Sequence, residues 1–178
     1  MGAGLYKDSP KAQGVFDLID DALSFDLTKL MFEGPADELQ KTVNSQPAIM
    51  AMSLAALATL EEYRIQDSLK PAAYAGHSVG EYTSLVSSGV LDVESGIRLV
   101  RERGRLMQKA SDLHEGGMAA IIGLDDITVE EICQETGVEI ANVNSDSQIV
   151  ISGDRISLAR AMDFCAARGA RKTIPLAV

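Results

Sequence analysis

The sequence is poor in several residue types that often mark function. It has no tryptophan, two cysteines and two histidines, and its 16 basic residues are outnumbered by 26 acidic ones. The net charge of −10 argues against nucleic-acid binding and against attraction to membrane surfaces. Cys133 and Cys165 show neither metal-ligand spacing nor a Cys-x-x-Cys pattern, so we expect buried thiols of a cytoplasmic protein rather than a disulfide. We predict neither a metal site nor a cofactor.

Long hydrophobic runs are also missing. No uninterrupted apolar run reaches membrane-spanning length, and the N-terminal residues lack the apolar stretch of a signal peptide. The apolar content of 46% is nevertheless high enough for a buried core. A chain of this length usually forms one domain or two small ones. These features predict a cytoplasmic enzyme with no membrane partner and no nucleic-acid partner.

The most informative stretch is 71–81, where a short apolar run leads into Gly76-His77-Ser78-Val79-Gly80 and a helical pattern follows. Gly-x-Ser-x-Gly in this setting is typical of a nucleophile elbow, in which a strand turns sharply into a helix and holds a serine at the turn. We expect both glycines to prevent collisions at the bend. Ser78 is then the candidate nucleophile, and the backbone N–H of Val79 is the candidate donor to an oxyanion. The alternative is a glycine-rich turn whose serine caps a helix.

Around this motif the first half of the sequence has helical periodicity. We predict helices over 9–22, 26–32 and 35–42, and a long apolar helix opening at 44–47 that packs beneath the strand before Ser78. A further helix over about 91–110 carries Arg98, Arg101, Arg103 and Arg105. Most of these arginines are expected to pair with nearby glutamates on a solvated face. One of them could instead face a site and hold a carboxylate through two parallel hydrogen bonds.

The second half has a different pattern. We predict a strand over 118–124, a helix over 128–135, strands over 138–143 and 148–152, a helix over 155–168 and a strand over 170–174 that Pro175 ends. This β-α-β-β-α-β order is that of ferredoxin-like domains. The glycines near 112–117 mark the boundary. We therefore predict a first domain over 1–113 and a small subdomain over 114–178.

Five stretches, in order, carry a resemblance to a known family. Gly76-His77-Ser78-Val79-Gly80-Glu81 resembles the GHS-[LV]-GE motif of malonyl-CoA:acyl-carrier-protein transacylases and of the acyltransferase domains of fatty acid and polyketide synthases. The similarity covers essentially the whole chain. The other four stretches are Gln46-Pro47-Ala48, Arg103-Gly104-Arg105-Leu106-Met107-Gln108, Met118-Ala119-Ala120-Ile121, and Ala141-Asn142-Val143-Asn144-Ser145 with Gln148-Ile149-Val150-Ile151-Ser152-Gly153.

The resemblance implies a fold, a reaction and partners. The fold is α/β, a partial α/β-hydrolase-like core with an inserted ferredoxin-like βαββαβ subdomain. Ser78 would attack the thioester of malonyl-CoA, and the phosphopantetheine thiol of acyl carrier protein would then take the malonyl group, in fatty acid biosynthesis. Arg103 would hold the malonyl carboxylate, while His77 and Asn142 would contact the substrate. For Asn142 an equally weighted alternative is hydrogen bonding at a strand end. The full-length protein would be a monomer.

The sequence also departs from the family pattern. The family's Gly-Gln-Gly segment, whose glutamine completes the oxyanion hole, is not found before 2–6, and the family's general-base histidine follows a strand that here reaches Val178. His77 is expected to point away from Ser78, and His114 falls in the boundary segment. A serine without a base is a weak nucleophile. We therefore expect a fragment of a longer transferase, with negligible transfer by the 178 residues alone.

Other functions remain open. A polyketide synthase acyltransferase domain would share all of these motifs. A serine hydrolase or thioesterase would share the elbow but release the acyl group to water, and Arg103 with the other motifs argues against it. A non-catalytic module that docks a carrier protein would fit the missing base.

Overall fold

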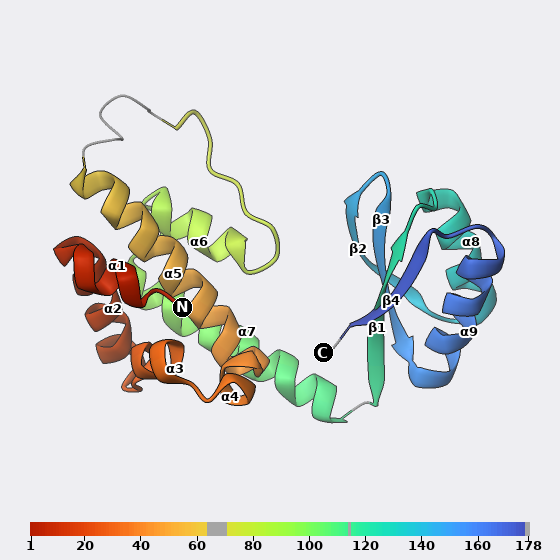
Figure 1. The fold of residues 1–178 in the computed structure, drawn as a ribbon, viewed down its shortest axis with the longest axis horizontal. Helices are drawn as coiled ribbons and strands as arrows, with labels where there is room; N and C mark the ends of the chain where they lie inside the picture. Colours follow the sequence, from red (N-terminus) through yellow and green to blue (C-terminus); the bar gives the residue numbers. More distant parts are fainter. Residues whose placement is uncertain (64–70, 114, 177–178) are drawn as a thin grey trace. The chain divides into compact units, whose positions relative to one another are not determined.

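The computed structural model describes residues 1–63, 71–113 and 115–176. The chain divides into two compact units, Met1–Lys109 and Ala110–Val178. Within the described residues the first unit consists of helices, and the second combines helices with an antiparallel sheet (Figure 1). The protein is therefore mixed α/β, as predicted, with its described strands confined to the second unit.

Helix α1 was not predicted, whereas most other helices of the first unit begin and end close to the positions that the sequence predicts. Ser9 caps the second helix, because its hydroxyl accepts a hydrogen bond from the backbone N–H of Ala12 at 3.1 Å and Pro10 follows in the first turn. Gly34 ends the third helix. The elements are α1 (Ala3–Asp8), α2 (Pro10–Leu23), α3 (Leu27–Glu33), α4 (Ala36–Gln40), α5 (Thr42–Glu62), α6 (Gly80–Ser87) and α7 (Val93–Leu113), the last of which continues past Lys109.

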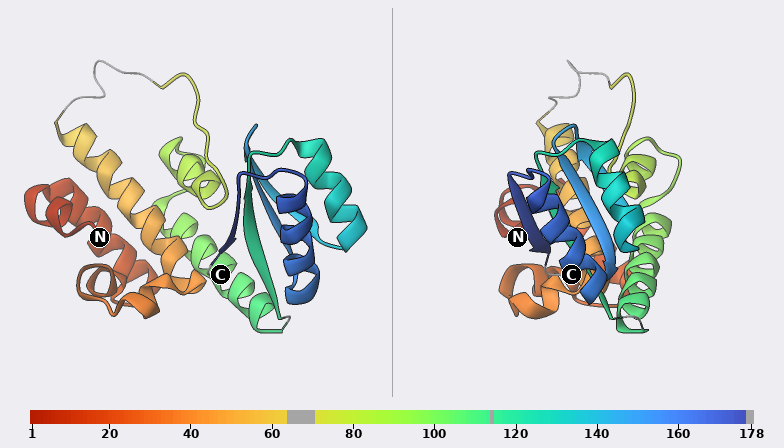
Figure 2. Two further views of the ribbon diagram at one scale, coloured as in Figure 1. Left: turned by 45° about the vertical axis from the view of Figure 1, so that its right-hand side comes forward. Right: turned by 90° about the vertical axis from the view of Figure 1, so that its right-hand side faces the viewer.

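Helix α5 is the central element of the first unit. It runs between α1 to α4 on one side and α6 with α7 on the other (Figures 1 and 2). Its Met50 is fully buried and Met52 is packed against the same core, as expected for a long apolar helix. By length and composition α5 could cross a membrane, which was not expected. The core helix of a soluble protein passes the same test, and the buried residues of α5 include the polar Asn44 and Gln46.

Two details of this unit differ from the predictions. Helix α5 starts at Thr42, so Pro47 lies inside the helix rather than opening it. The residues before Ser78 are not a strand: within the described part of the first unit no strand exists to pair with 71–75, and a lone extended segment cannot form a ladder. Helix α5 still lies beneath this segment, because Ile49 and Ser53 line a hollow of about 460 Å³ together with residues of 71–76 and α6.

The second unit has the predicted βαββαβ order. Its elements are β1 (Gly116–Ile122), α8 (Asp126–Thr136), β2 (Glu139–Ser145), β3 (Gln148–Asp154), α9 (Arg155–Ala167) and β4 (Lys172–Leu176). The sheet order is β2-β3-β1-β4, and all three neighbouring pairs are antiparallel. This places β1 and β3 in the middle of the sheet, as in the ferredoxin-like arrangement.

Helices α8 and α9 cover one face of this sheet (Figures 1 and 2). Their apolar residues meet those of the central strands in a core that includes Ile121, Ile149 and Ile151. Cys133 and Cys165 are buried free thiols in the same core, as expected. Asp125 and Asp154 cap the two helices through hydrogen bonds to backbone N–H groups.

The last strand corrects one prediction. Pro175 was expected to end a strand over 170–174, but it lies inside β4, opposite Ala119 of β1. Strand β4 is at the edge of the sheet, where a residue without an N–H can be accommodated because one side of the strand needs no donors.

Candidate active site

Ser78 occupies a tight exposed turn directly before α6. Its φ is 54°, in the left-handed region that residues with a side chain rarely adopt. The backbone N–H groups of Gly80 and Glu81 donate to the carbonyl oxygens of His77 and Ser78 at 2.9 and 3.2 Å. These bonds close the turn and lead the chain into the helix. The strained serine at a helix start is the local geometry of a nucleophile elbow, although no strand precedes it.

The two glycines of the motif have different roles. A Cβ on Gly76 would lie 2.0 Å from both the carbonyl carbon and the oxygen of Gly80, so only glycine fits there. A Cβ on Gly80 would meet nothing within 4 Å. The expectation that both glycines avoid a collision is therefore right for Gly76 and wrong for Gly80. The space that a side chain on Gly76 would need is already occupied by the backbone of Gly80.

The backbone N–H of Val79 is available to a ligand. No described residue accepts a hydrogen bond from it, whereas the next three N–H groups along the chain all bond to carbonyls of the turn. An N–H at the start of a helix also lies at the positive end of the helix dipole. The group can therefore donate to negative charge that forms on an atom bonded to Ser78.

Arg103 of α7 reaches the turn. Its Nη2 donates a hydrogen bond to Ser78 Oγ at 3.1 Å, and its Nη1 donates to Gln46 Oε1 of α5. A guanidinium on the hydroxyl favours negative charge at this position. The two side chains are 25 residues apart in the sequence, and the packing of α7 on the first turn of α5 and on α6 brings them together.

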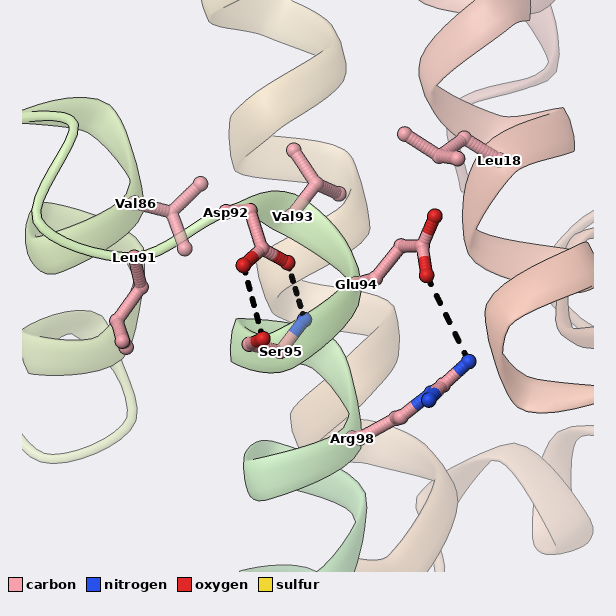
Figure 3. Close-up of a pocket in the computed structure, with 8 residues that line it drawn as sticks. All are labelled: Leu18, Val86, Leu91, Asp92, Val93, Glu94, Ser95 and Arg98. Carbon is pink, nitrogen blue, oxygen red and sulfur yellow. Dashed lines mark hydrogen bonds and ion pairs between the residues drawn. The ribbon is translucent and has the colours of Figure 1, made fainter.

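The other arginines of α7 have different partners. Arg98 pairs with Glu94 at 3.6 Å (Figure 3), and it also donates to the carbonyl of Ala22. Arg105 makes two hydrogen bonds to Glu102, at 2.6 and 2.7 Å. Arg101 lies with its guanidinium carbon 4.2 Å from the centre of the Phe25 ring. Of the four arginines predicted on this helix, Arg103 is thus the one that is hydrogen-bonded to Ser78. The hollow of about 660 Å³ in Figure 3 lies at the start of α7 and is lined by neither Ser78 nor Arg103.

The remaining candidate residues are less well defined. His77 is exposed, and within the described chain its imidazole has no hydrogen-bond partner, so its contact with substrate remains a prediction. Asn142 lies half-buried on β2 in the second unit and also remains a prediction. His114 lies outside the described residues. No group of three or more metal-ligating side chains occurs within the described ranges.

Sequence reasoning missed two residues that are linked to Ser78 through Arg103. Gln46 holds Arg103 and also donates from its Nε2 to Met107 Sδ at 3.1 Å. Both belong to stretches that carried the family resemblance, Gln46-Pro47-Ala48 and 103–108, and this was the available signal. Nothing in their spacing along the chain shows that they meet.

A serine in a left-handed turn at a helix start, with a backbone donor and a cation beside it, is an arrangement typical of serine-nucleophile enzymes. Residues 1–176 match the family described as acyl transferase domain. The chain belongs to this acyl transferase family.

Within this family, the similar proteins include malonyltransferases that act with acyl carrier protein. A malonyl CoA-acyl carrier protein transacylase of Haemophilus influenzae is 42% identical over 182 residues, which are 100% of this chain and 58% of that protein. The crystal structure of an acyl-carrier-protein-S-malonyltransferase from Bartonella henselae matches with a TM-score of 0.93 and 42% identity, again over 100% of this chain and 58% of that one. A type II PKS acyl-carrier protein in complex with its malonyl-transacylase matches with a TM-score of 0.89, 40% identity and the same two coverages. The chain thus spans 58% of the length of these relatives.

Proposed function

We propose that this chain is the Ser78-bearing part of an [acyl-carrier-protein] S-malonyltransferase. The enzyme moves a malonyl group from coenzyme A to the phosphopantetheine thiol of acyl carrier protein in fatty acid biosynthesis. The single observation that carries the proposal is the hydrogen bond of 3.1 Å from Arg103 Nη2 to Ser78 Oγ. It brings a nucleophile and a carboxylate-binding group to one place, and the names of the relatives agree with the substrates.

The chemistry divides among three groups. Ser78 Oγ attacks the thioester carbonyl of malonyl-CoA, the carbonyl oxygen becomes an oxyanion that accepts from the Val79 N–H, and coenzyme A leaves as its thiol. The carrier-protein thiol then attacks the malonyl ester by the same route. The proton of Ser78 needs a general base, and neither His77 nor His114 is assigned to that role. We place the base in a part of the protein outside these residues.

Arg103 gives the acyl specificity in this proposal. When malonyl-CoA binds, its carboxylate takes the guanidinium donors that otherwise bond to Ser78. An acetyl group has no such carboxylate, so it leaves the half-buried Arg103 cation without an anionic partner, which penalises acetyl relative to malonyl. Discrimination between malonyl and acetyl therefore arises from one side chain.

The proposal includes the arrangement of the whole protein. Residues 1–113 belong to an α/β-hydrolase-like core and 114–178 form its ferredoxin-like subdomain, with His77 and Asn142 contacting the substrate. Helix α6 behind the serine and the central helix α5 support the first assignment, and the βαββαβ order supports the second. The enzyme acts as a cytoplasmic monomer.

The test uses the product of the full open reading frame that encodes this chain. The rate of acyl-enzyme formation is measured by intact mass with malonyl-CoA and acetyl-CoA, together with transfer to phosphopantetheinylated carrier protein. Ser78→Ala should abolish the mass gain. Arg103→Ala should lower kcat/KM for malonyl-CoA by about 100-fold and leave the acetyl reaction much less affected.

Arg105→Ala is the matched control, since it removes an arginine of the same helix that pairs with Glu102. It should leave the preference for malonyl intact. Release of malonate to water with no transfer to the carrier protein would identify a hydrolase instead. An unchanged malonyl preference in Arg103→Ala would refute the role of the arginine.

A further inference from the structure

Gln46 lies between two residues of α7. Its Oε1 accepts a hydrogen bond from Arg103 Nη1, and its Nε2 donates to Met107 Sδ at 3.1 Å. Arg103 and Met107 are four residues apart, so they occupy one face of α7. Gln46 is only 7% exposed as a residue, so its amide depends on these two partners rather than on water.

The two partners determine which way the amide points. A guanidinium has donors only, so the amide must turn its oxygen toward Arg103. The amide nitrogen then faces the opposite way and needs an acceptor. The thioether sulfur of Met107 is a weak acceptor in that position, which stabilises this orientation over the flipped one.

A close crossing of two helices makes the contact possible. A Cβ on Gly104 would lie 2.6 Å from the carbonyl oxygen of Thr42 and 2.9 Å from Val43 Cα. Glycine at this point lets α7 approach the first turn of α5 directly. As a result, Gln46 can reach both Arg103 and Met107 from the next turn of α5.

We propose that Gln46 is a positioning residue that sets the acyl specificity of the Ser78 site through Arg103, with Met107 holding the Gln46 amide in register. This inference rests on the proposed malonyl transfer. Gln46 touches neither Ser78 nor the acyl group in this scheme. By fixing Nη1, it leaves Nη2 directed toward Ser78, where it can bind the malonyl carboxylate while the thioester carbonyl lies at the Ser78 hydroxyl.

The test is again acyl-enzyme formation by the product of the full open reading frame. Gln46→Leu removes both hydrogen bonds and should lower kcat/KM for malonyl-CoA by about tenfold, with acetyl-CoA changed less than about twofold. Gln46→Glu retains the acceptor but neutralises Arg103, so the malonyl preference should fall further than in Gln46→Leu. In the Arg103→Ala background, Gln46→Leu should have no further effect on the preference, because it acts only through the arginine.

Met107→Leu provides a second measurement in case Gln46→Leu does not fold. The substitution conserves volume and removes the sulfur acceptor, so it should lower the malonyl preference by about threefold, whereas Met52→Leu, at a core position away from Gln46, should not change it. Equal loss with both acyl donors, or an additive effect in the Arg103→Ala background, would overturn the inference. If wild type prefers malonyl and Arg103→Ala abolishes that preference while the Gln46 and Met107 variants retain it, only this inference fails. Absence of any acyl-Ser78 in wild type would refute the proposed function itself.

Discussion

At the scale of single residues, the turn at Ser78 depends on one close backbone approach. A left-handed φ at a serine costs on the order of 1–3 kcal/mol and persists only when the surroundings enforce it. The enforcement comes from the bonds that link His77 and Ser78 to the start of α6, and from Gly76, whose missing side chain lets the incoming chain touch Gly80.

This contact gives a matched pair of substitutions. Gly76→Ala would place its Cβ 2.0 Å from Gly80 and should destabilise the chain by about 1–3 kcal/mol. Gly80→Ala meets no atom within 4 Å and lies in the first turn of α6, so it should be neutral or stabilising by up to about 1 kcal/mol. Urea denaturation of the 178-residue chain measures both. Equal effects of the two substitutions would contradict this account of the turn.

At the scale of elements, α7 connects the candidate nucleophile with the core. Ile97 and Val100 are fully buried, Arg103 extends to Ser78, and Gly104 touches the first turn of α5. One helix thus combines a packing face and a functional face, and its distance from α5 determines where the guanidinium lies.

Gly104→Ala tests that distance. The added Cβ would meet the backbone of Thr42 and Val43, which cannot rotate away, so we expect a loss of about 1–3 kcal/mol in the free energy of unfolding. Gly14→Ala is the control, because a Cβ on Gly14 of α2 would have no neighbour within 4 Å, and the change should add up to about 1 kcal/mol. If Gly104→Ala were as well tolerated as Gly14→Ala, the close helix crossing would be wrong.

The start of α7 should also make stability depend on pH. The Asp92 carboxylate accepts hydrogen bonds from the backbone N–H and the hydroxyl of Ser95 at 2.7 and 2.9 Å (Figure 3), and they hold the pKa of Asp92 below its usual value of 3.8. A lowered folded-state pKa means that the contribution is present above the unfolded pKa and is lost as pH falls through the folded one.

Asp92→Asn should accordingly lower the melting temperature at neutral pH. The difference from wild type should begin to shrink once the pH falls below about 4 and should disappear below the lowered folded-state pKa of Asp92, where both side chains are neutral. Circular dichroism melts over a pH series make the comparison. A difference that stays constant down to about pH 2 would show that the charge of Asp92 contributes nothing.

At the scale of the whole molecule, the two units have separate hydrophobic cores, and both cysteines belong to the second. Burial raises the pKa of the Cys133 thiol, and burial with the neighbouring Cys133 raises that of Cys165 to about 11. Neither thiol is therefore a reactive thiolate near neutral pH. Their reaction with an aromatic disulfide reagent should report on opening of the second unit.

One substitution in each core tests whether the two units open independently. Leu158→Ala lies in the second core and should destabilise it by about 2–5 kcal/mol, which speeds thiol labelling strongly. Leu54→Ala lies in the first core and should leave the labelling rate unchanged, because separate cores open independently. Fast labelling of the native wild type, or equal acceleration by both substitutions, would contradict the picture of two independent units.

Local patterns predicted much of this structure. The periodicity of 9–22 and the Ser9-Pro10 start signal predicted α2, and the alternation of helix and strand patterns after Gly116 predicted the βαββαβ order. These features depend on residues that are neighbours in the sequence. Pro175 and the segment before Ser78 were misjudged, because the outcome for a strand depends on whether a partner lies beside it.

The sequence by itself determined that Ser78 sits at a glycine-flanked turn before a helix. It also indicated that one arginine of the helix over about 91–110 could face the same site. The family resemblance had already pointed to Arg103. Only the tertiary structure decided that Arg103 bonds to Ser78, that Gln46 holds Arg103 and in turn bonds to Met107, and that Gly76 rather than Gly80 is indispensable. The physical reason is that helix formation and turn chemistry are local, whereas these contacts depend on how closely α5, α6 and α7 pack across long stretches of chain.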